Sequence, residues 1–316
     1  MISIAIIPCY KSKEKAAEVA EETLKYVDKV ICVDDNCPYG THEFIRKKIT
    51  NENLLIIKNK FNLGVGGAFK KGLAAAIDLG ADNIIKVDSD GQMKPELIPL
   101  FLEQLKSNKA SFVKGNRFTN SHVIIRMPKI RLLGNLSLGF LTKISTGYWE
   151  LFDPTNGFIA FKTKIIKQVP LHKLDNRFFF ETDLLFRMSL IDTFISEIPI
   201  DANYDDEESN LNAIKEIPNF LLRHFYLILK RIIYSYFLLD FNPGTFFLLI
   251  SILFGLISFF LASYHFIYAA MNNTTTDPGI QTLFLALFFI SLQFLINFIH
   301  YDVSQKPLMR MIKNKR

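Results

Sequence analysis

Cysteine is scarce in this sequence, with three residues, Cys9, Cys32 and Cys37, among 316. The number is odd and the spacing is not one that structural metal sites use, which argues against a disulfide framework and against a zinc site held by cysteine. We expect the thiols to be reduced, with Cys9 and Cys32 packed as small apolar side chains. The cysteines therefore indicate a protein part that faces the cytoplasm.

Charged residues are missing from two long stretches near the C-terminus. No Asp, Glu, Lys or Arg occurs between Asp240 and Asp277, or between Asp277 and Asp302. Each stretch exceeds the roughly 20 residues that a helix needs to cross a bilayer. The pattern predicts two transmembrane helices, Thr245–Ala270 and Gly279–His300. The alternative is a buried helical hairpin inside a soluble core.

Basic residues predict how these helices are oriented. The connector "MNNTTTDPGI" has no Lys or Arg, whereas the tail "QKPLMRMIKNKR" is rich in both. The positive-inside rule places both ends of the hairpin in the cytoplasm and the connector outside. The first residues, "MISIAII", lack a basic leader and the apolar run breaks at Pro8, so we expect no signal peptide. We therefore predict a multi-pass membrane protein whose catalytic part and both termini are cytoplasmic.

The net charge of +6 fits a protein that lies against an anionic membrane surface. The part before the spans has no concentrated patch of basic and aromatic residues, so nucleic acid is not an expected partner. Because membrane helices often associate, a homo-oligomer is a further expectation.

Residues 1–210 alternate between strand-like and helix-like segments. "SIAIIPCY", "KVICVDD", "NLLIIKNK", "NIIKVDSD" and "ASFVKGNRF" resemble strands, and "KEKAAEVAEETLKYV", "GGAFKKGLAAAIDLG" and "PELIPLFLEQLKS" resemble helices. This rhythm predicts an α/β domain with a mostly parallel, Rossmann-like sheet covered on both faces. Residues 211–240 mix bulky apolar and basic residues, which indicates amphipathic juxtamembrane helices. The two spans occupy 241–301, and 302–316 form a basic tail.

Two carboxylates follow a strand-like segment in "KVDSDGQ", residues 86–92. Asp88 and Asp90 are two positions apart, so on an extended backbone they point to the same side. Like charges this close remain ionised most easily beside a cation. Mg²⁺ or Mn²⁺ fits, because a hard divalent ion prefers carboxylate oxygens and leaves coordination sites for substrate phosphates. A solvated turn is the alternative for this pattern taken alone.

In order along the chain, "IPCY", "VDDNCPYGT", "NLGVGGAFKKG", "VDSDGQMKP", "GNRF", "IRLLGN", "DPTNGF" and "RFFFETDLL" match known motifs. Over about residues 2–200, the chain resembles family 2 glycosyltransferases with a GT-A fold, and within them the polyprenyl-phosphate glycosyltransferases typified by dolichyl-phosphate mannose synthase. Three residues depart from the usual pattern: Asn36 and Cys37 stand where Gly and Ser are common, and Met93 stands where His is frequent.

The resemblance implies a donor site. Its nucleotide-sugar-binding residues would be Pro8, Tyr10, Asp34, Asp35, Gly67, Lys70, Asp88 and Ser89. Its metal ligands would be Asp88, Asp90 and Gln92, binding Mg²⁺ or Mn²⁺. A surface acidic turn is the alternative for Asp34 and Asp35, and tight packing is the alternative for the glycine-rich segment.

The resemblance also implies an acceptor site. Arg117 and Arg131 would bind the acceptor phosphate, because a guanidinium suits two-point phosphate contacts, and together with Asp90 they form the catalytic set. Arg126, Asp153, Glu181 and Asp183 are acceptor-side candidates. A surface salt bridge is the alternative for each arginine.

The implied reaction is an inverting, metal-dependent transfer of a hexose from UDP- or GDP-hexose to undecaprenyl or dolichyl phosphate. One alternative is a membrane glycosyltransferase that acts on a glycolipid or polysaccharide hydroxyl with Asp153, Glu181 or Asp183 as base. A processive synthase would carry Q-x-x-R-W, whereas the one tryptophan lies in "GYWELF". A catalytically inactive scaffold is disfavoured because Asp88, Asp90 and Gln92 are all present.

Overall fold

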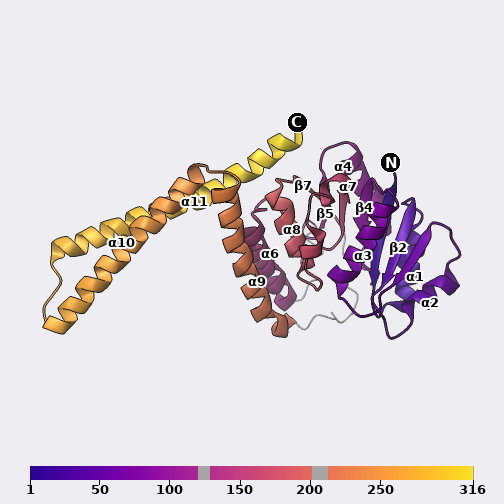
Figure 1. Cartoon of the computed structure of the whole chain (residues 1–316), viewed down its shortest axis with the longest axis horizontal. Helices are drawn as coiled ribbons and strands as arrows, with labels where there is room; N and C mark the ends of the chain where they lie inside the picture. Colours follow the sequence, from indigo (N-terminus) through magenta and orange to yellow (C-terminus); the bar gives the residue numbers. More distant parts are fainter. Residues whose placement is uncertain (120–128, 201–212, 316) are drawn as a thin grey trace. The chain divides into compact units, whose positions relative to one another are not determined.

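The computed structural model describes residues 1–119, 129–200 and 213–315 (Figure 1). The chain divides into two compact units, made mainly of Met1–Ile228 and of Leu229–Met309. Each unit is described by itself.

The first unit is built on a seven-stranded sheet in the order β3-β2-β1-β4-β6-β5-β7. β6 is antiparallel to both neighbours, β4 and β5, and the other pairs are parallel. The strands are β1 (Ser3–Cys9), β2 (Lys29–Asp34), β3 (Leu54–Lys58), β4 (Asn83–Lys86), β5 (Phe112–Asn116), β6 (Ile159–Lys162) and β7 (Ile195–Pro199). β1, β2, β4 and β5 are fully or almost fully buried, as expected for strands covered on both faces.

Helices cover both faces of this sheet. They are α1 (Lys13–Thr23), α2 (Thr41–Lys48), α3 (Val65–Asp78), η1 (Pro95–Leu97), α4 (Ile98–Lys106), α6 (Lys129–Thr146), α7 (Thr163–Ile166), η2 (Leu171–Lys173), α8 (Phe180–Leu190) and α9 (Ala213–Ile233). α1 and α4 enclose one apolar core with the sheet. α3 and α8 enclose the other. α6 packs on α8, and α9 adds a small cluster of Phe179, Phe186 and Leu227.

The mostly parallel sheet and the strands expected in the first 116 residues are confirmed. The antiparallel strand β6 and the final strand β7 were not predicted. β6 has only four residues, in "IAFK", and no strand–helix alternation precedes it. Its place between β4 and β5 results from pairing between residues far apart in sequence, which local patterns do not report.

The second unit holds two long apolar helices, α10 (Pro243–Asn272) and α11 (Pro278–Lys315), which run antiparallel as a hairpin in Figure 1. Both are long and apolar enough to cross a membrane, over Pro243–Asn272 and Pro278–Ser304. Hydroxyl groups connect them: Ser258 donates to the carbonyl of Phe284 at 2.7 Å, and Ser291 donates to the carbonyl of Ser251 at 2.8 Å. These bonds satisfy hydroxyl groups that would find no hydrogen-bond partner among lipid chains.

A buried ion pair lies at the base of the hairpin. Arg231 donates from Nη1 and Nη2 to the two carboxylate oxygens of Asp302, at 2.7 and 2.9 Å. Tyr236, in the short helix η3 (Tyr234–Leu238), donates its hydroxyl to the same carboxylate at 2.5 Å. All three residues are almost fully buried. The carboxylate thus joins the segment before the first span to the end of the second.

Candidate active site

The candidate site lies at the carboxyl ends of β1, β2 and β4, which are parallel neighbours and so end at one edge of the sheet. Pro8 is buried within β1, and Tyr10, just after it, is 38% exposed. Ser12 follows on the same turn, and its hydroxyl donates to that of Ser89 at 2.7 Å. This contact joins the turn after β1 to the turn after β4, where the metal-binding motif is predicted.

Asp34, at the end of β2, is 1% exposed and organises the turn that follows it. Its carboxylate accepts bonds from the backbone N–H of Cys37 at 2.7 Å and of His42 at 2.9 Å, and it contacts Nδ1 of His42 at 2.6 Å. Asn36 has φ +56° in this turn, a conformation that asparagine tolerates better than most residues. The thiol of Cys37 accepts a bond from the Thr41 hydroxyl. Asn36 and Cys37 thus fit this turn, at positions where the resembled motif more often has Gly and Ser.

Asp35 is 3% exposed and holds the glycine-rich loop. Its carboxylate accepts bonds from the Asn59 side chain at 2.7 Å, the Leu63 N–H at 2.9 Å and the Gly64 N–H at 2.7 Å. Every carboxylate oxygen of Asp34 and Asp35 therefore already accepts a bond from the chain itself. Direct contact of either residue with a nucleotide stays a prediction.

The glycines that begin α3 pack against residues 174–177. Gly64 has φ +88°, and a Cβ there would lie 2.6 Å from the carbonyl of Asn176. Gly67 donates its N–H to that same carbonyl at 2.9 Å. Lys70 donates Nζ to the carbonyl of Leu174 at 2.8 Å, and its burial lowers its pKa. The loop is thus closely packed, and phosphate contacts of Gly67 and Lys70 stay predictions.

The turn after β4 brings the predicted metal ligands together. Asp90 accepts the backbone N–H of Gln92 at 3.0 Å, and the N–H of Asp88 lies 3.3 Å from the thioether of Met93. Burial raises the pKa of Asp90, and the nearby charge of Asp88 raises it further. A cation beside this carboxylate pair would offset the repulsion. Two carboxylates and one amide oxygen suit a hard divalent ion that shares its remaining coordination with substrate.

Among residues 1–119, 129–200 and 213–315, no group of three or more His, Cys, Asp or Glu side chains converges as a ligand set. Metal binding by Asp88, Asp90 and Gln92 therefore stays a prediction. A substrate diphosphate would have to supply further oxygens.

Arg117, which follows β5, is held by Asp153. Arg117 donates from Nε to Oδ2 of Asp153 at 2.7 Å and from Nη2 to Oδ1 at 2.9 Å. Asp153 is fully buried, and Glu197 accepts the N–H groups of Phe152 and Asp153. Burial alone would raise the pKa of Asp153, but the hydrogen bonds and charge of Arg117 outweigh it and hold the pKa below its usual value.

Two further acceptor-side candidates, Glu181 and Asp183, have different ion-pair partners. Glu181 and Asp183 lie in the first turn of α8. Glu181 contacts the ammonium of Lys86 at 3.2 Å. Asp183 instead pairs with Arg187 at 3.0 Å and accepts the N–H of Asp175 at 2.9 Å. Of these two acids, only Glu181 contacts a residue at the end of β4, Lys86, directly before the predicted metal ligands.

The two other predicted acceptor-side arginines are Arg131 and Arg126. Arg131 lies in the first turn of α6. Arg126 falls within 120–128, outside the described residues.

Comparison with known proteins places this site in a family. The sequence model of glycosyl transferase family 2 matches residues 4–169, more than half of the chain. The chain belongs to this family.

Two relatives of this glycosyltransferase act on lipid phosphates by their names. UDP-N-acetylglucosamine–dolichyl-phosphate N-acetylglucosaminyltransferase of Methanococcus voltae is 28% identical over 64% of this chain and 85% of the relative. Undecaprenyl-phosphate mannosyltransferase of Micrococcus luteus is 25% identical over 62% of this chain and 82% of the relative.

Solved structures share the GT-A fold. Mannosyl-3-phosphoglycerate synthase from Rubrobacter xylanophilus superposes with a TM-score of 0.56 at 14% identity, over 77% of this chain and 78% of that one. Glucosyl-3-phosphoglycerate synthase from Mycobacterium tuberculosis, solved with Mn²⁺ and UDP, gives 0.52 at 13% identity, over 73% and 79%. At this identity the likeness shows the fold alone.

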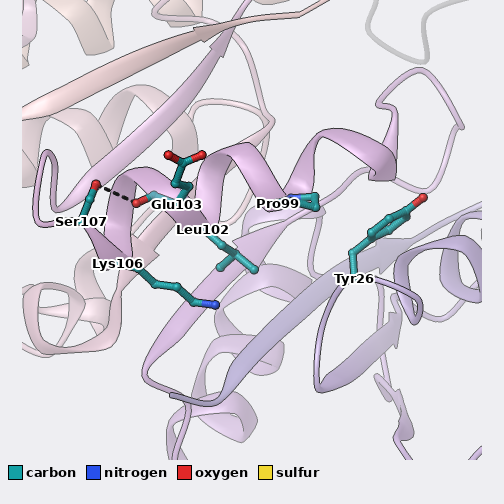
Figure 2. A pocket seen from close by; sticks show the side chains of 6 residues that line it. All are labelled: Tyr26, Pro99, Leu102, Glu103, Lys106 and Ser107. Carbon is teal, nitrogen blue, oxygen red and sulfur yellow. Dashed lines mark hydrogen bonds between the residues drawn. The ribbon is translucent and has the colours of Figure 1, made fainter.

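A surface depression of the glycosyltransferase unit lies away from this site (Figure 2). Tyr26, Pro99, Leu102, Glu103, Lys106 and Ser107 line it. Tyr26 precedes β2 and Ser107 precedes β5, so the depression lies toward the amino ends of the parallel strands. The described contacts connect none of its residues to the donor or acceptor candidates.

Three residues of the site were not predicted from the sequence: Lys86, Lys114 and Gly157. Lys86 contacts Asp88, Glu181 and the carbonyl of Gly157. The signal that could have found the lysines is a lysine inside an apolar strand, in "NIIKVD" and "SFVKGN", directly before a site motif. Lysine is almost never fully buried unless it is paired.

Proposed function

We propose that this glycosyltransferase moves a hexose from a nucleoside diphosphate sugar to a membrane polyprenyl phosphate, with inversion at the anomeric carbon. The names of the two relatives support the acceptor class, since each acts on dolichyl or undecaprenyl phosphate. The two apolar helices α10 and α11 support it as well, because a lipid acceptor stays in the bilayer.

The observation that carries the proposal is the pairing of the acceptor-side acids. Asp153 is paired with Arg117, Asp183 with Arg187 and Glu181 with Lys86. The hydrogen bonds and charge of Arg117 lower the pKa of Asp153 and make it a weaker base, although burial raises the pKa of Asp183 despite its pairing with Arg187. A hydroxyl acceptor needs a base, whereas a phosphate monoester with a second pKa near 6 is already a nucleophilic dianion at neutral pH.

On the donor side, Asp88, Asp90 and Gln92 would hold Mg²⁺ or Mn²⁺. When bound, the ion supplies positive charge for the departing nucleoside diphosphate. Pro8, Tyr10, Asp34, Asp35 and Ser89 would surround the space where the nucleotide lies. The repulsion between Asp88 and Asp90 supports this assignment, because a divalent ion removes it.

On the acceptor side, Arg117 would bind the attacking phosphate, and Arg131 and Arg126 would add to the positive charge. The two bonds that Arg117 donates to Asp153 fix the plane of the guanidinium, so less orientational freedom remains to be lost on binding. The chain's own work is then mainly to place the phosphate in line with the anomeric carbon.

We further propose a cytoplasmic glycosyltransferase unit, with the connector 273–277 outside and the basic tail inside. The exposed apolar residues of α9, such as Leu222, Phe225 and Tyr226, would contact the membrane surface next to the first span. Such contacts would keep the site near the lipid acceptor.

The test is a transfer assay with the full chain in detergent or nanodiscs. Purified protein is incubated with a panel of radiolabelled UDP- and GDP-hexoses, Mg²⁺ or Mn²⁺, and undecaprenyl or dolichyl phosphate. We expect one sugar to pass into the organic extract as a mild-acid-labile lipid. Transfer only to a glycolipid or polysaccharide hydroxyl, with none to either lipid phosphate, would contradict the proposal.

A further inference from the structure

Two lysines lie fully buried in the sheet directly behind the site. Lys86 in β4 and Lys114 in β5 are each 1% exposed. Both pair in register with the same residue of the strand between them, Ile159 of β6. Side chains of directly opposed residues point to the same face of a sheet. The two ammonium groups therefore lie on one face, which is the face that α8 covers with Glu181.

The two ammonium groups bind consecutive carbonyls of the "DPTNGF" segment. Lys114 donates Nζ to the carbonyl of Asn156, and Lys86 donates Nζ to the carbonyl of Gly157 at 3.2 Å. We call Lys86 and Lys114 the lysine clamp. It holds this segment, which the structure describes as lying in neither a helix nor a strand.

Each lysine is also connected to one part of the predicted active site, Lys86 to the donor side and Lys114 to the acceptor side. Lys86 contacts Oδ1 of the predicted metal ligand Asp88 at 2.5 Å and Oε1 of Glu181 at 3.2 Å. The segment that Lys114 holds leads to the acceptor side, because the Asn156 side chain donates to Asp153 at 3.4 Å and Asp153 binds Arg117. The clamp thus connects the donor carboxylate to the acceptor arginine through five residues of backbone.

The electrostatics of the two lysines differ. Burial would lower the pKa of Lys86, but Asp88 and Glu181 outweigh burial and raise the pKa. For Lys114, burial dominates and lowers the pKa, although Glu181, Asp153 and Glu197 oppose it. A buried ammonium is costly unless it is paired, so its presence at both positions needs a reason beyond packing.

We propose that Lys86 and Lys114 are positioning residues, which set the separation of Asp88 and Arg117 and so place the sugar donor in line with the attacking acceptor. The inference rests on the proposed function for the roles of those two residues. Lys86 has a second consequence, since its ammonium competes with a divalent ion for Asp88.

Gly157 allows the clamp to be tested without removing a charge. A Cβ on Gly157 would lie 2.6 Å from Oε1 of Glu181, 2.7 Å from Nζ of Lys86 and 2.9 Å from Oδ2 of Asp88. All three atoms are ends of flexible side chains. Gly157→Ala should therefore fold while pushing these groups apart.

The experiment uses the full-length protein and four variants: Lys86→Met, Lys114→Met, Gly157→Ala and, as a matched control, Lys162→Met. Lys162 also lies in the sheet and hydrogen-bonds a side chain, Asn108, but no described contact joins it to the site. Affinity for Mn²⁺ alone is measured by electron paramagnetic resonance. Steady-state kinetics use the nucleotide sugar and acceptor that the wild-type protein accepts, and melting temperature reports folding.

For Lys86→Met we expect tighter Mn²⁺ binding together with a kcat that falls roughly 10- to 100-fold, because misplacement of about 1 Å costs that much. If Lys86 only stabilised the fold, its replacement would not raise the affinity for Mn²⁺ while lowering kcat. For Lys114→Met we expect unchanged Mn²⁺ affinity and an acceptor KM about tenfold higher. Gly157→Ala should lower kcat without tightening Mn²⁺ binding, and Lys162→Met should match the wild type.

Wild-type kcat and Mn²⁺ affinity in folded Lys86→Met would overturn the proposal, as would a loss of activity that excess Mn²⁺ restores. If the methionine variants do not fold, Lys86→Arg and Gly157→Ala decide. Arginine should keep wild-type Mn²⁺ affinity and recover part of kcat, and wild-type kcat in Gly157→Ala would refute the clamp. If the wild type transfers only to hydroxyl acceptors, the proposed function fails, but Mn²⁺ binding and kinetics with that acceptor still test the clamp.

Discussion

Arg117 and Asp153 form a two-point ion pair in which the carboxylate is fully buried and the guanidinium is partly exposed, at 17%. Asp153 also accepts the backbone N–H of Arg117 at 3.1 Å. The acid that could have been a base in a hydroxyl-accepting enzyme is here committed to orienting an arginine. The hydrogen bonds and charge of Arg117 hold its pKa below its usual value in spite of burial, so it is a weak base.

Replacing Arg117 by lysine should weaken use of the acceptor. Lysine keeps the charge but cannot make the two parallel bonds to Asp153, so the cation loses its fixed orientation. We expect the acceptor KM to rise about tenfold or more, with a small effect on donor KM. Arg46→Lys, at an exposed position of α2, is the control. Equal acceptor kinetics in the two variants would show that Arg117 does not bind the acceptor.

Asp90→Asn should abolish transfer and Mn²⁺ binding while the protein stays folded. The substitution removes a carboxylate whose charge the fold does not need, because burial and Asp88 already disfavour its ionised form. The melting temperature should not fall, and calorimetric titration with Mn²⁺ checks the metal. Asp78→Asn, at the exposed end of α3, is the matched control. Substantial transfer by Asp90→Asn would remove the metal-site assignment.

The glycosyltransferase unit should lose stability in mild acid because of His224. This residue of α9 is 1% exposed and lies 2.9 Å from the Ser145 hydroxyl, and burial lowers its pKa to about 4. In the unfolded chain it takes up a proton near its ordinary value of 6.5. Between these values the unfolded state binds more protons, so stability falls as pH falls, by up to about 3 kcal/mol.

Melting of the full chain, followed by the fluorescence of Trp149 from about pH 7 down to about pH 5, checks this. His224→Gln should flatten the pH dependence, since glutamine does not titrate, whereas His172→Gln, at an exposed position, should not. The same slope in His224→Gln as in the wild type would assign the effect to other groups.

The Arg231–Asp302 pair predicts a marked asymmetry between single and double substitutions. Removing either partner leaves a buried charge without compensation, which costs about 3–5 kcal/mol, whereas replacing both by apolar residues of similar size is often neutral. Arg231→Met and Asp302→Leu should each lower the melting temperature of the full chain in detergent, and the double variant should recover most of the loss. Additive losses in the double variant would rule out a direct pair.

Much of the fold was predictable because the signals are local. The five strands up to Asn116 are apolar segments separated by helices with amphipathic or capped sequences, so their existence and direction follow from periodicity and chain connectivity. The uncharged stretches that predicted α10 and α11 are equally local. By contrast, the antiparallel β6 depends on a choice of partners, β4 and β5, that no pattern within "IAFK" records.

The candidate site was predictable in its parts but not in its connections. Asp88, Asp90 and Arg117 were found because each follows a strand and stands in a known motif. The pairing of Arg117 with Asp153, and of Lys86 with Glu181, joins residues 36 and 95 positions apart. The sequence offered Asp153 and Glu181 as candidate bases, and only their partners in space show that both carboxylates are already paired.

By itself, the chain's order of residues settled which groups exist: an acidic turn, two guanidinium positions, a glycine-rich loop and two uncharged helices. Only the tertiary structure decided which of those charged groups pair with one another. A buried charge needs a counter-charge, and the packing of the helices and strands determines which one lies beside it. The two buried ammonium groups show this best, since the carbonyls that they bind, of Asn156 and Gly157, lie 42 and 71 positions away in the sequence.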